Sequence, residues 1–254
     1  MAQNHDNSLQ QHDKHPVGQP IYHPAHPIIE DHHNHSVYEE LLCHLPYAIF
    51  SVAFGLIVLS CLQFVTSGMS GQVSIPHKAA KALFHSFHFL HLIFAATGTV
   101  LMFLRFSTNK FLALIVGTLA PAVFCLLSDV VLPYLGGRLL GVPMHLHICF
   151  ISEYQNVLPF LIIGIVNGFA MSKHAPSNLA FYSVGSHFIH ILVSSMASLL
   201  YLVSHGFVHW QSQMGIIFLF LLIAVLVPCT LSDVVVPMLF ARSKGARGNE
   251  KHPA

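Results

Sequence analysis

Carboxylates are almost absent from the apolar part of this sequence. Of the ten Asp and Glu residues in 254, six lie within residues 1–40 and one is Glu250. Only Asp129, Glu153 and Asp233 lie between, among long uncharged apolar runs. A soluble protein carries about a quarter of its residues as charges, whereas this chain has 8%. The sequence therefore excludes a soluble enzyme and predicts an integral membrane protein.

Six segments are long enough to cross a bilayer as helices, which takes about 20 residues. Nothing alternates with a period of two, so we expect an all-α, polytopic membrane protein rather than a barrel. A net charge of only +1 gives no basis for nucleic-acid binding. The predicted spans are 43–66, 80–104, 111–135, 148–171, 179–204 and 213–240.

Basic residues set the expected orientation. With six spans, both ends of the chain lie on one side of the membrane, and that side holds eight of the eleven Lys and Arg residues. Positive charge favours the cytoplasmic side, so we expect both termini in the cytoplasm, in a cell membrane such as a bacterial inner membrane. Residues 1–38 form a polar, His-rich tail that we expect to be disordered. Loose metal capture and mere solubility both remain open for this tail.

Two sequence motifs occur twice. Residues 125–133 (CLLSDVVLP) match residues 229–237 (CTLSDVVVP) at an offset of 104. The HFLH motif at 88–91 matches HFIH at 187–190 at an offset of 99. The pairs keep the same order along the chain, and differences in loop length account for the unequal offsets. We interpret the matches as an internal duplication.

A weaker third match, at an offset of 113, joins the Leu-Pro-aromatic motifs around Pro46 and Pro159. The duplication then predicts two three-helix units, residues 39–138 and 148–242, followed by a cytoplasmic C-terminal tail at 243–254. Three is an odd number, so the second unit crosses the membrane in the opposite sense. This inverted-topology plan is common among secondary transporters, whose sites lie near the midplane between the repeats.

The repeated motifs hold the chemistry. A carboxylate facing lipid costs on the order of 3 kcal/mol, so we expect the intramembrane acids to face the protein interior. Histidines three residues apart share one helix face. From their depths we predict an outer and an inner metal-binding cluster. The outer ligands are His88, His91, Asp129 and Glu153, and the inner ligands are His187, His190, Asp233 and Glu40.

Several neighbouring residues are weaker candidates. Cys125 and Cys229 each lie one helical turn before an aspartate and are possible additional ligands. A proline four residues after each aspartate is expected to loosen the helix there. His85 lacks a repeat partner, and we expect it to be a packing residue. His147, just outside the fourth span, is a candidate for capturing ions.

Imidazoles with carboxylates suit a divalent transition metal such as Zn, Fe, Mn or Ni. Protons and metal compete for the same groups, so we predict a proton-coupled secondary transporter whose partners are membrane lipid and the metal ion. Two alternatives remain: a membrane metalloenzyme or haem-binding oxidoreductase subunit, and a metal sensor or assembly factor that does not transport. The metal, the direction and the oligomeric state, homo-oligomer included, stay open.

Overall fold

The computed structural model describes residues 37–70, 75–173, 179–207 and 209–241. These residues are helical apart from short connections, and no strand occurs among them. The predicted C-terminal tail and all but the last two residues of the N-terminal tail lie outside the described residues. Six described helices are long and apolar enough to cross a membrane, as predicted. They are Leu41–Gly68, His77–Phe106, Lys110–Leu139, Tyr154–Met171, His187–Ser204 and Trp210–Ala241.

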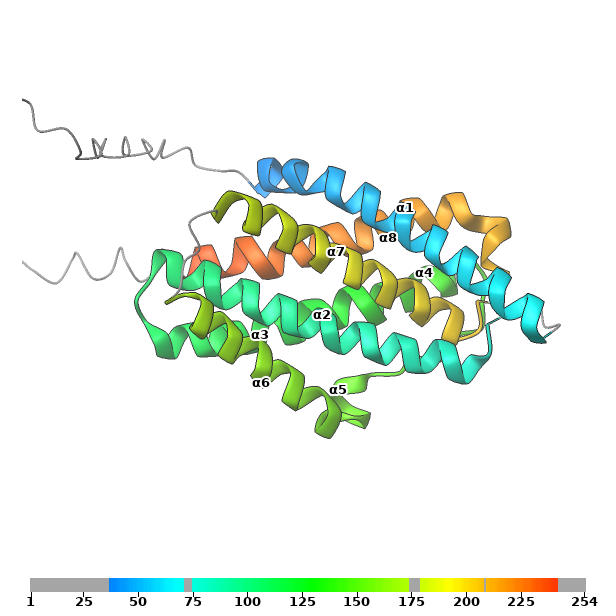
Figure 1. Cartoon of the computed structure of the whole chain (residues 1–254), viewed down its shortest axis with the longest axis horizontal. Coiled ribbons are helices and arrows are strands. Elements are labelled where there is room, and N and C mark those ends of the chain that lie inside the picture. The colour runs from blue at the N-terminus through cyan, green and yellow to red at the C-terminus, as the bar shows by residue number, and fades with distance from the viewer. Residues whose placement is uncertain (1–36, 71–74, 174–178, 208, 242–254) are drawn as a thin grey trace, which may run out of the picture. The chain divides into compact units, whose positions relative to one another are not determined.

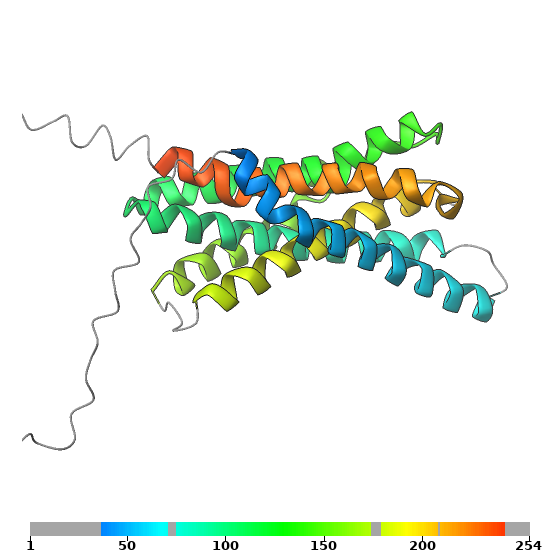
Figure 2. The same cartoon turned by 90° about the horizontal axis from the view of Figure 1, so that it is seen from above.

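Two helices form the centre of the bundle, α2 (His77–Phe106) and α7 (Leu179–Ser204), which pack against each other (Figure 1). Small side chains are buried on both, as lipid-embedded helices require for close approach. Helix α1 (Val37–Ser70) packs on α7, and α6 (Tyr154–Met171) packs on α2. In two perpendicular views the long helices follow one common direction (Figures 1 and 2).

The two LSDVV sequences interrupt their helices in the same way. Helix α3 (Lys110–Leu126) continues through a π-helical turn, η1 (Leu127–Val131), into α4 (Leu132–Leu139). Helix α8 (Met214–Thr230) likewise continues through a π-helical turn, η3 (Leu231–Val235), into residues 236–241. A short 3₁₀ turn, η2 (Trp210–Gln213), precedes α8. The proline after each π-helical turn lacks an N–H and crowds the aspartate carbonyl four residues before it. A wider π turn relieves this crowding.

The fourth span starts six residues later than predicted. A one-turn helix, α5 (Cys149–Ser152), precedes it, and Glu153 then leaves the helical conformation with φ −133° and ψ 33°. The chain bends at this residue, and its carboxylate lies beside His85 and His147. The bend therefore places the one charged residue of this segment beside polar partners at the end of the bundle.

Large apolar side chains cover the outside of the helices. Phe64 is 80% exposed and Phe111 is 72% exposed. Exposed apolar surface of this extent is unfavourable in water, but it is the surface a hydrocarbon environment requires. The interior contains a separate apolar core that includes Phe84, Tyr201 and Trp210.

The contact between α6 and α2 allows a test of this packing. A Cβ atom on Gly164 would lie 2.7 Å from the Ile93 carbonyl oxygen and 2.8 Å from the Ala96 Cβ. Because a backbone atom cannot move aside, we expect Gly164→Ala to reduce the free energy of unfolding by about 1–3 kcal/mol. Nothing lies within 4 Å of a Cβ on Gly215, so Gly215→Ala serves as the control. Equal thermal unfolding midpoints for the two variants would contradict this packing.

Candidate metal centre

Asp129 is fully buried and binds four polar side chains. Its Oδ2 lies 2.9 Å from His88 Nδ1 and 2.7 Å from His91 Nδ1. Its Oδ1 accepts hydrogen bonds from Ser128 Oγ at 2.8 Å and from Ser194 Oγ at 2.9 Å. Because the two histidines are three residues apart on α2, they reach the same carboxylate. This set of donors holds an ionised carboxylate inside the bundle.

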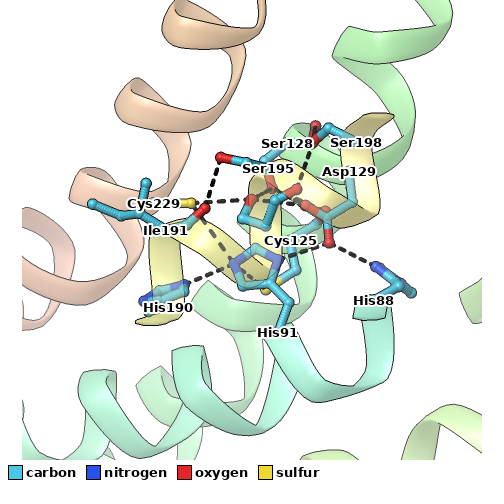
Figure 3. A network of polar contacts seen from close by, with 11 residues as sticks. His88, His91, Cys125, Ser128, Asp129, His190, Ile191, Ser195, Ser198 and Cys229 are labelled. Atoms are coloured by element: carbon cyan, nitrogen blue, oxygen red, sulfur yellow. Dashed lines mark hydrogen bonds and ion pairs between the residues drawn. The ribbon is translucent and has the colours of Figure 1, made fainter. Parts of the chain in front are cut away.

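His91 connects this carboxylate to the other half of the chain. Its Nε2 lies 2.7 Å from the Nε2 of His190 on α7, as Figure 3 shows. The Nδ1 of His190 in turn contacts the carboxylate of Asp233. A continuous polar chain of carboxylate, imidazole, imidazole and carboxylate therefore crosses between α2 and α7. We expected two separate clusters, and these contacts join them.

Two thiols lie beside the paired imidazoles. The Sγ atoms of Cys229 and Cys125 lie 3.7 Å and 3.8 Å from His91 Nε2. Cys229 also contacts Ser194 Oγ at 3.5 Å. The ligand atoms of His91, His190 and Cys229 lie within 4.8 Å of one another. Cys125 and Cys229, which we treated as additional candidates, are thus among the closest donors to the paired rings.

The carboxylates fix which nitrogen of each ring is free. An ionised carboxylate only accepts hydrogen bonds, so the Nδ1 atoms of His91 and His190 carry protons. Each Nε2 then points toward the other ring and toward the thiols. Metal-binding histidines commonly use this arrangement, in which a carboxylate orients the ring and the opposite nitrogen binds the metal. Asp129 and Asp233 therefore hold these rings at Nδ1 and leave each Nε2 directed toward the other ring.

The donor spacing fits a tetrahedral ion after a small movement. Zinc bonds to nitrogen at about 2.0–2.1 Å and to sulfur at about 2.3 Å. Two tetrahedral ligands are then roughly 3.3 Å apart for nitrogen pairs and roughly 3.6 Å apart for nitrogen and sulfur. The observed sulfur–nitrogen distance of 3.7 Å matches this spacing. The two Nε2 atoms at 2.7 Å are closer and would need to separate slightly.

The two aspartates differ in their surroundings. Asp233 Oδ1 has no hydrogen-bond partner among the described residues, and neither does the neighbouring Ser232 Oγ. The equivalent oxygen of Asp129 accepts a hydrogen bond from Ser194 of α7. The residue that corresponds to Ser194 in the first half, 99 positions earlier on α2, is Ala95, which has no hydroxyl to donate to Asp233. Asp129 is therefore firmly held, whereas one oxygen of Asp233 remains available.

A second group of donors lies where α5 and α6 meet α2. The ligand atoms of His85, His147 and Cys149 lie within 4.8 Å of one another. Glu153 Oε1 lies 3.4 Å from His85 Nε2 and 3.7 Å from His147 Nε2. Burial raises the pKa of the Cys149 thiol, outside the spans, to about 12. The thiol is therefore protonated at neutral pH unless a metal displaces its proton.

The remaining predicted ligands lie elsewhere. Glu153, which we expected beside His88, belongs to this second group. His187 lies against His44 of α1, with ring centroids 4.8 Å apart. The side chain of Glu40 lies outside the described residues. Of the eight predicted ligands, the structure brings together His88, His91, Asp129, His190 and Asp233.

Sequence reasoning missed the serine of α7 that binds Asp129. Ser194, Ser195 and Ser198 are all buried, and Ser198 Oγ donates to the Ser128 carbonyl at 3.0 Å. Three serines within five residues of one span were a visible signal, because buried hydroxyls in lipid-embedded helices need partners.

Comparisons with known protein families, with curated proteins and with solved structures find no match for this chain. The six apolar helices and the buried groups of His and Cys are compatible with a membrane metal-binding protein.

The different surroundings of the two aspartates predict different costs of replacement. Asp129→Asn removes the negative charge and replaces one of the two acceptor oxygens by an NH₂ donor. As the loss of a buried ionic partner, it is expected to cost about 3–5 kcal/mol of unfolding free energy. Asp233→Asn is expected to cost less, because among the described residues His190 is the one close partner of its carboxylate. Thermal unfolding of the purified variants measures both. An equal or larger loss for Asp233→Asn would contradict this asymmetry.

Proposed function

We propose that this chain is a secondary transporter that exchanges a divalent transition-metal ion for protons across a membrane. The 2.7 Å contact between His91 Nε2 and His190 Nε2 is the main support. It brings two metal-binding atoms together between the halves of the chain, beside a thiol and inside a buried region. A proton shared between the two Nε2 atoms occupies the place that a metal ion would take.

Counting protons supports exchange. If both carboxylates are ionised, each Nδ1 holds one proton, and the short contact between His91 and His190 requires one more. A divalent ion that binds both Nε2 atoms displaces this shared proton. Binding Cys229 as a thiolate releases a second proton. One metal ion for two protons leaves the charge of the buried site unchanged, which avoids the cost of burying a net charge.

Symmetric contacts support the inverted repeat. Thr99 Oγ1 of the first half donates to the Ser232 carbonyl at 3.1 Å. Ser198 Oγ of the second half donates to the Ser128 carbonyl at 3.0 Å. The two donor residues are 99 positions apart and the two acceptor residues are 104 positions apart, which are the offsets that relate the sequence motifs. Both reach carbonyls inside the π-helical turns, next to the aspartates.

Glycine contacts follow the same relation. A Cβ on Gly168 would contact Val100, and a Cβ on Gly55 would contact Leu199. Gly55 lies 113 residues before Gly168, and Leu199 lies 99 residues after Val100, so both offsets are ones that relate the sequence motifs. The equivalent helices α1 and α6 run in opposite directions in Figure 1. Rocking one half against the other would open the site to each side in turn, as in other inverted-repeat transporters. With both termini cytoplasmic, the end of α7 near Ser204 faces outward.

The donor set also selects the class of ion. Nitrogen and sulfur donors favour Zn and similar borderline ions over Mg or Ca, which prefer oxygen. A haem shared by His91 and His190 would need a porphyrin plane between the rings, and a 2.7 Å gap leaves no room for one. This geometry favours ion transport over the haem-binding alternative.

Transport is testable in proteoliposomes that enclose a metal-sensitive dye and a pH-sensitive dye. External Zn²⁺ should enter while the lumen becomes more alkaline, because protons leave. His91→Ala and His190→Ala should each abolish both signals. His209→Ala, which alters an exposed histidine outside the site, should leave both unchanged. Metal binding without uptake by the unmodified protein would contradict transport and favour a sensor.

A matched variant tests the proton count. Cys229→Ser removes one of the two exchangeable protons, so the exchange should fall from two protons to one per Zn²⁺. Each cycle would then move net charge, and uptake should become sensitive to an imposed membrane voltage. Cys61→Ser, at an exposed position on α1, should retain two protons and voltage independence. An unchanged ratio in Cys229→Ser would contradict the proposed role of this thiol.

A further inference from the structure

Four donor side chains gather at the end of the bundle where α2 begins. We call His85, His147, Cys149 and Glu153 the mouth cluster. It is separate from the paired imidazoles, since His85 precedes His91 by six residues, or about 9 Å along a helix. The mouth cluster contains two imidazoles, a thiol and a carboxylate, which are all common zinc ligands.

The spacing within the mouth cluster is too long for good hydrogen bonds. Glu153 Oε1 lies 3.4 Å from His85 Nε2 and 3.7 Å from His147 Nε2. His85 Nε2 is buried and has no hydrogen-bond partner among the described residues. Two ligands of one tetrahedral zinc ion are roughly 3.3 Å apart. The donors therefore stand closer to metal-ligand spacing than to hydrogen-bond spacing.

The backbone holds these donors in position. The Glu153 N–H donates to the Cys149 carbonyl at 2.8 Å, which closes the turn of α5 and sets both side chains on one side. The His147 N–H donates to Tyr201 Oη at 3.2 Å, which anchors this loop residue to α7. A site whose ligands are already positioned loses less conformational entropy when it binds an ion.

We propose that the mouth cluster binds a second divalent transition-metal ion, independently of the central pair. Its side chains are accessible from outside the core, with exposed fractions of 15% for His85, 24% for Glu153 and 25% for His147. Cys149 is fully buried and forms the inner end of the cluster. An ion can therefore enter from the surface and find a thiol at the base.

The repeat does not reproduce the mouth cluster at the position equivalent to His85. The residue 99 positions after His85 is Val184, so the second half of the chain lacks this imidazole. Between the two sites, His88 Nε2 is buried without a hydrogen-bond partner among the described residues. If the proposed transport function holds, the mouth cluster loads or releases the ion on that side, and His88 lies on its path.

Cobalt absorption tests the site in the purified full-length chain. Co²⁺ bound to a thiolate gives a charge-transfer band, and the His-rich segment before Cys43 contains no cysteine that could contribute. Cys149→Ser should remove roughly a third to a half of this absorbance, because the mouth cluster supplies one of two or three bound thiolates. His147→Gln should cause the same loss although it removes no thiol. Cys61→Ser should remove none.

Intact absorbance in both Cys149→Ser and His147→Gln, at an unchanged size-exclusion profile, would overturn the proposal. Glu153→Gln gives a second readout in case a variant fails to fold, with weaker Co²⁺ binding expected. The measurement uses no membrane gradient, so its result stands apart from any failure of transport. In proteoliposomes, His147→Gln should raise the Zn²⁺ concentration for half-maximal uptake several-fold with an unchanged maximal rate. An unchanged half-maximal concentration would overturn the loading role.

Discussion

Two carboxylates inside an apolar bundle need partners, and the pairing of Asp129 and Asp233 with imidazoles governs the structure around them. Each acid lies in a π-helical turn. Hydroxyls from the neighbouring helix reach the carbonyls inside these turns. Such contacts require α2 to lie close to η3 and α7 close to η1, and small residues along both helices allow this approach. The polar site and the helix packing therefore depend on each other.

The sequence was sufficient for the spans and for the pairing within each half. The repeated HxxH and LSDVV motifs identified the aspartate partners of His88, His91 and His190, because helical spacing fixes the shared face, but the predicted place of His187 was wrong. It was not sufficient for the contact between His91 and His190, since depths counted from span ends carry errors of several ångströms. The partners of Glu153 were missed for a related reason: the break before α6 cannot be read from an apolar pattern, and this break decides where the carboxylate points.

The two copies of the repeated sequence motifs have different surroundings. Thr99 and Ser198 each donate a hydrogen bond to the serine carbonyl of a π-helical turn. In contrast, the residue that corresponds to Ser194 is Ala95, and the residue that corresponds to His85 is Val184. A duplicated protein with two identical halves would present the same surroundings to an ion from either side. The differences leave one aspartate with an available oxygen and one end of the bundle with additional donors. They give the bundle two distinguishable sides.

The central claim is that a metal ion binds between His91 and His190 with a thiol of the same site. X-ray absorption of the Cys149→Ser variant, loaded with less than one Zn²⁺ per chain, measures this directly. The account predicts nitrogen scatterers at about 2.0–2.1 Å together with sulfur at about 2.3 Å, and loss of the sulfur contribution when Cys229→Ser and Cys125→Ser are added. A first shell of nitrogen and oxygen alone in the Cys149→Ser protein would contradict it.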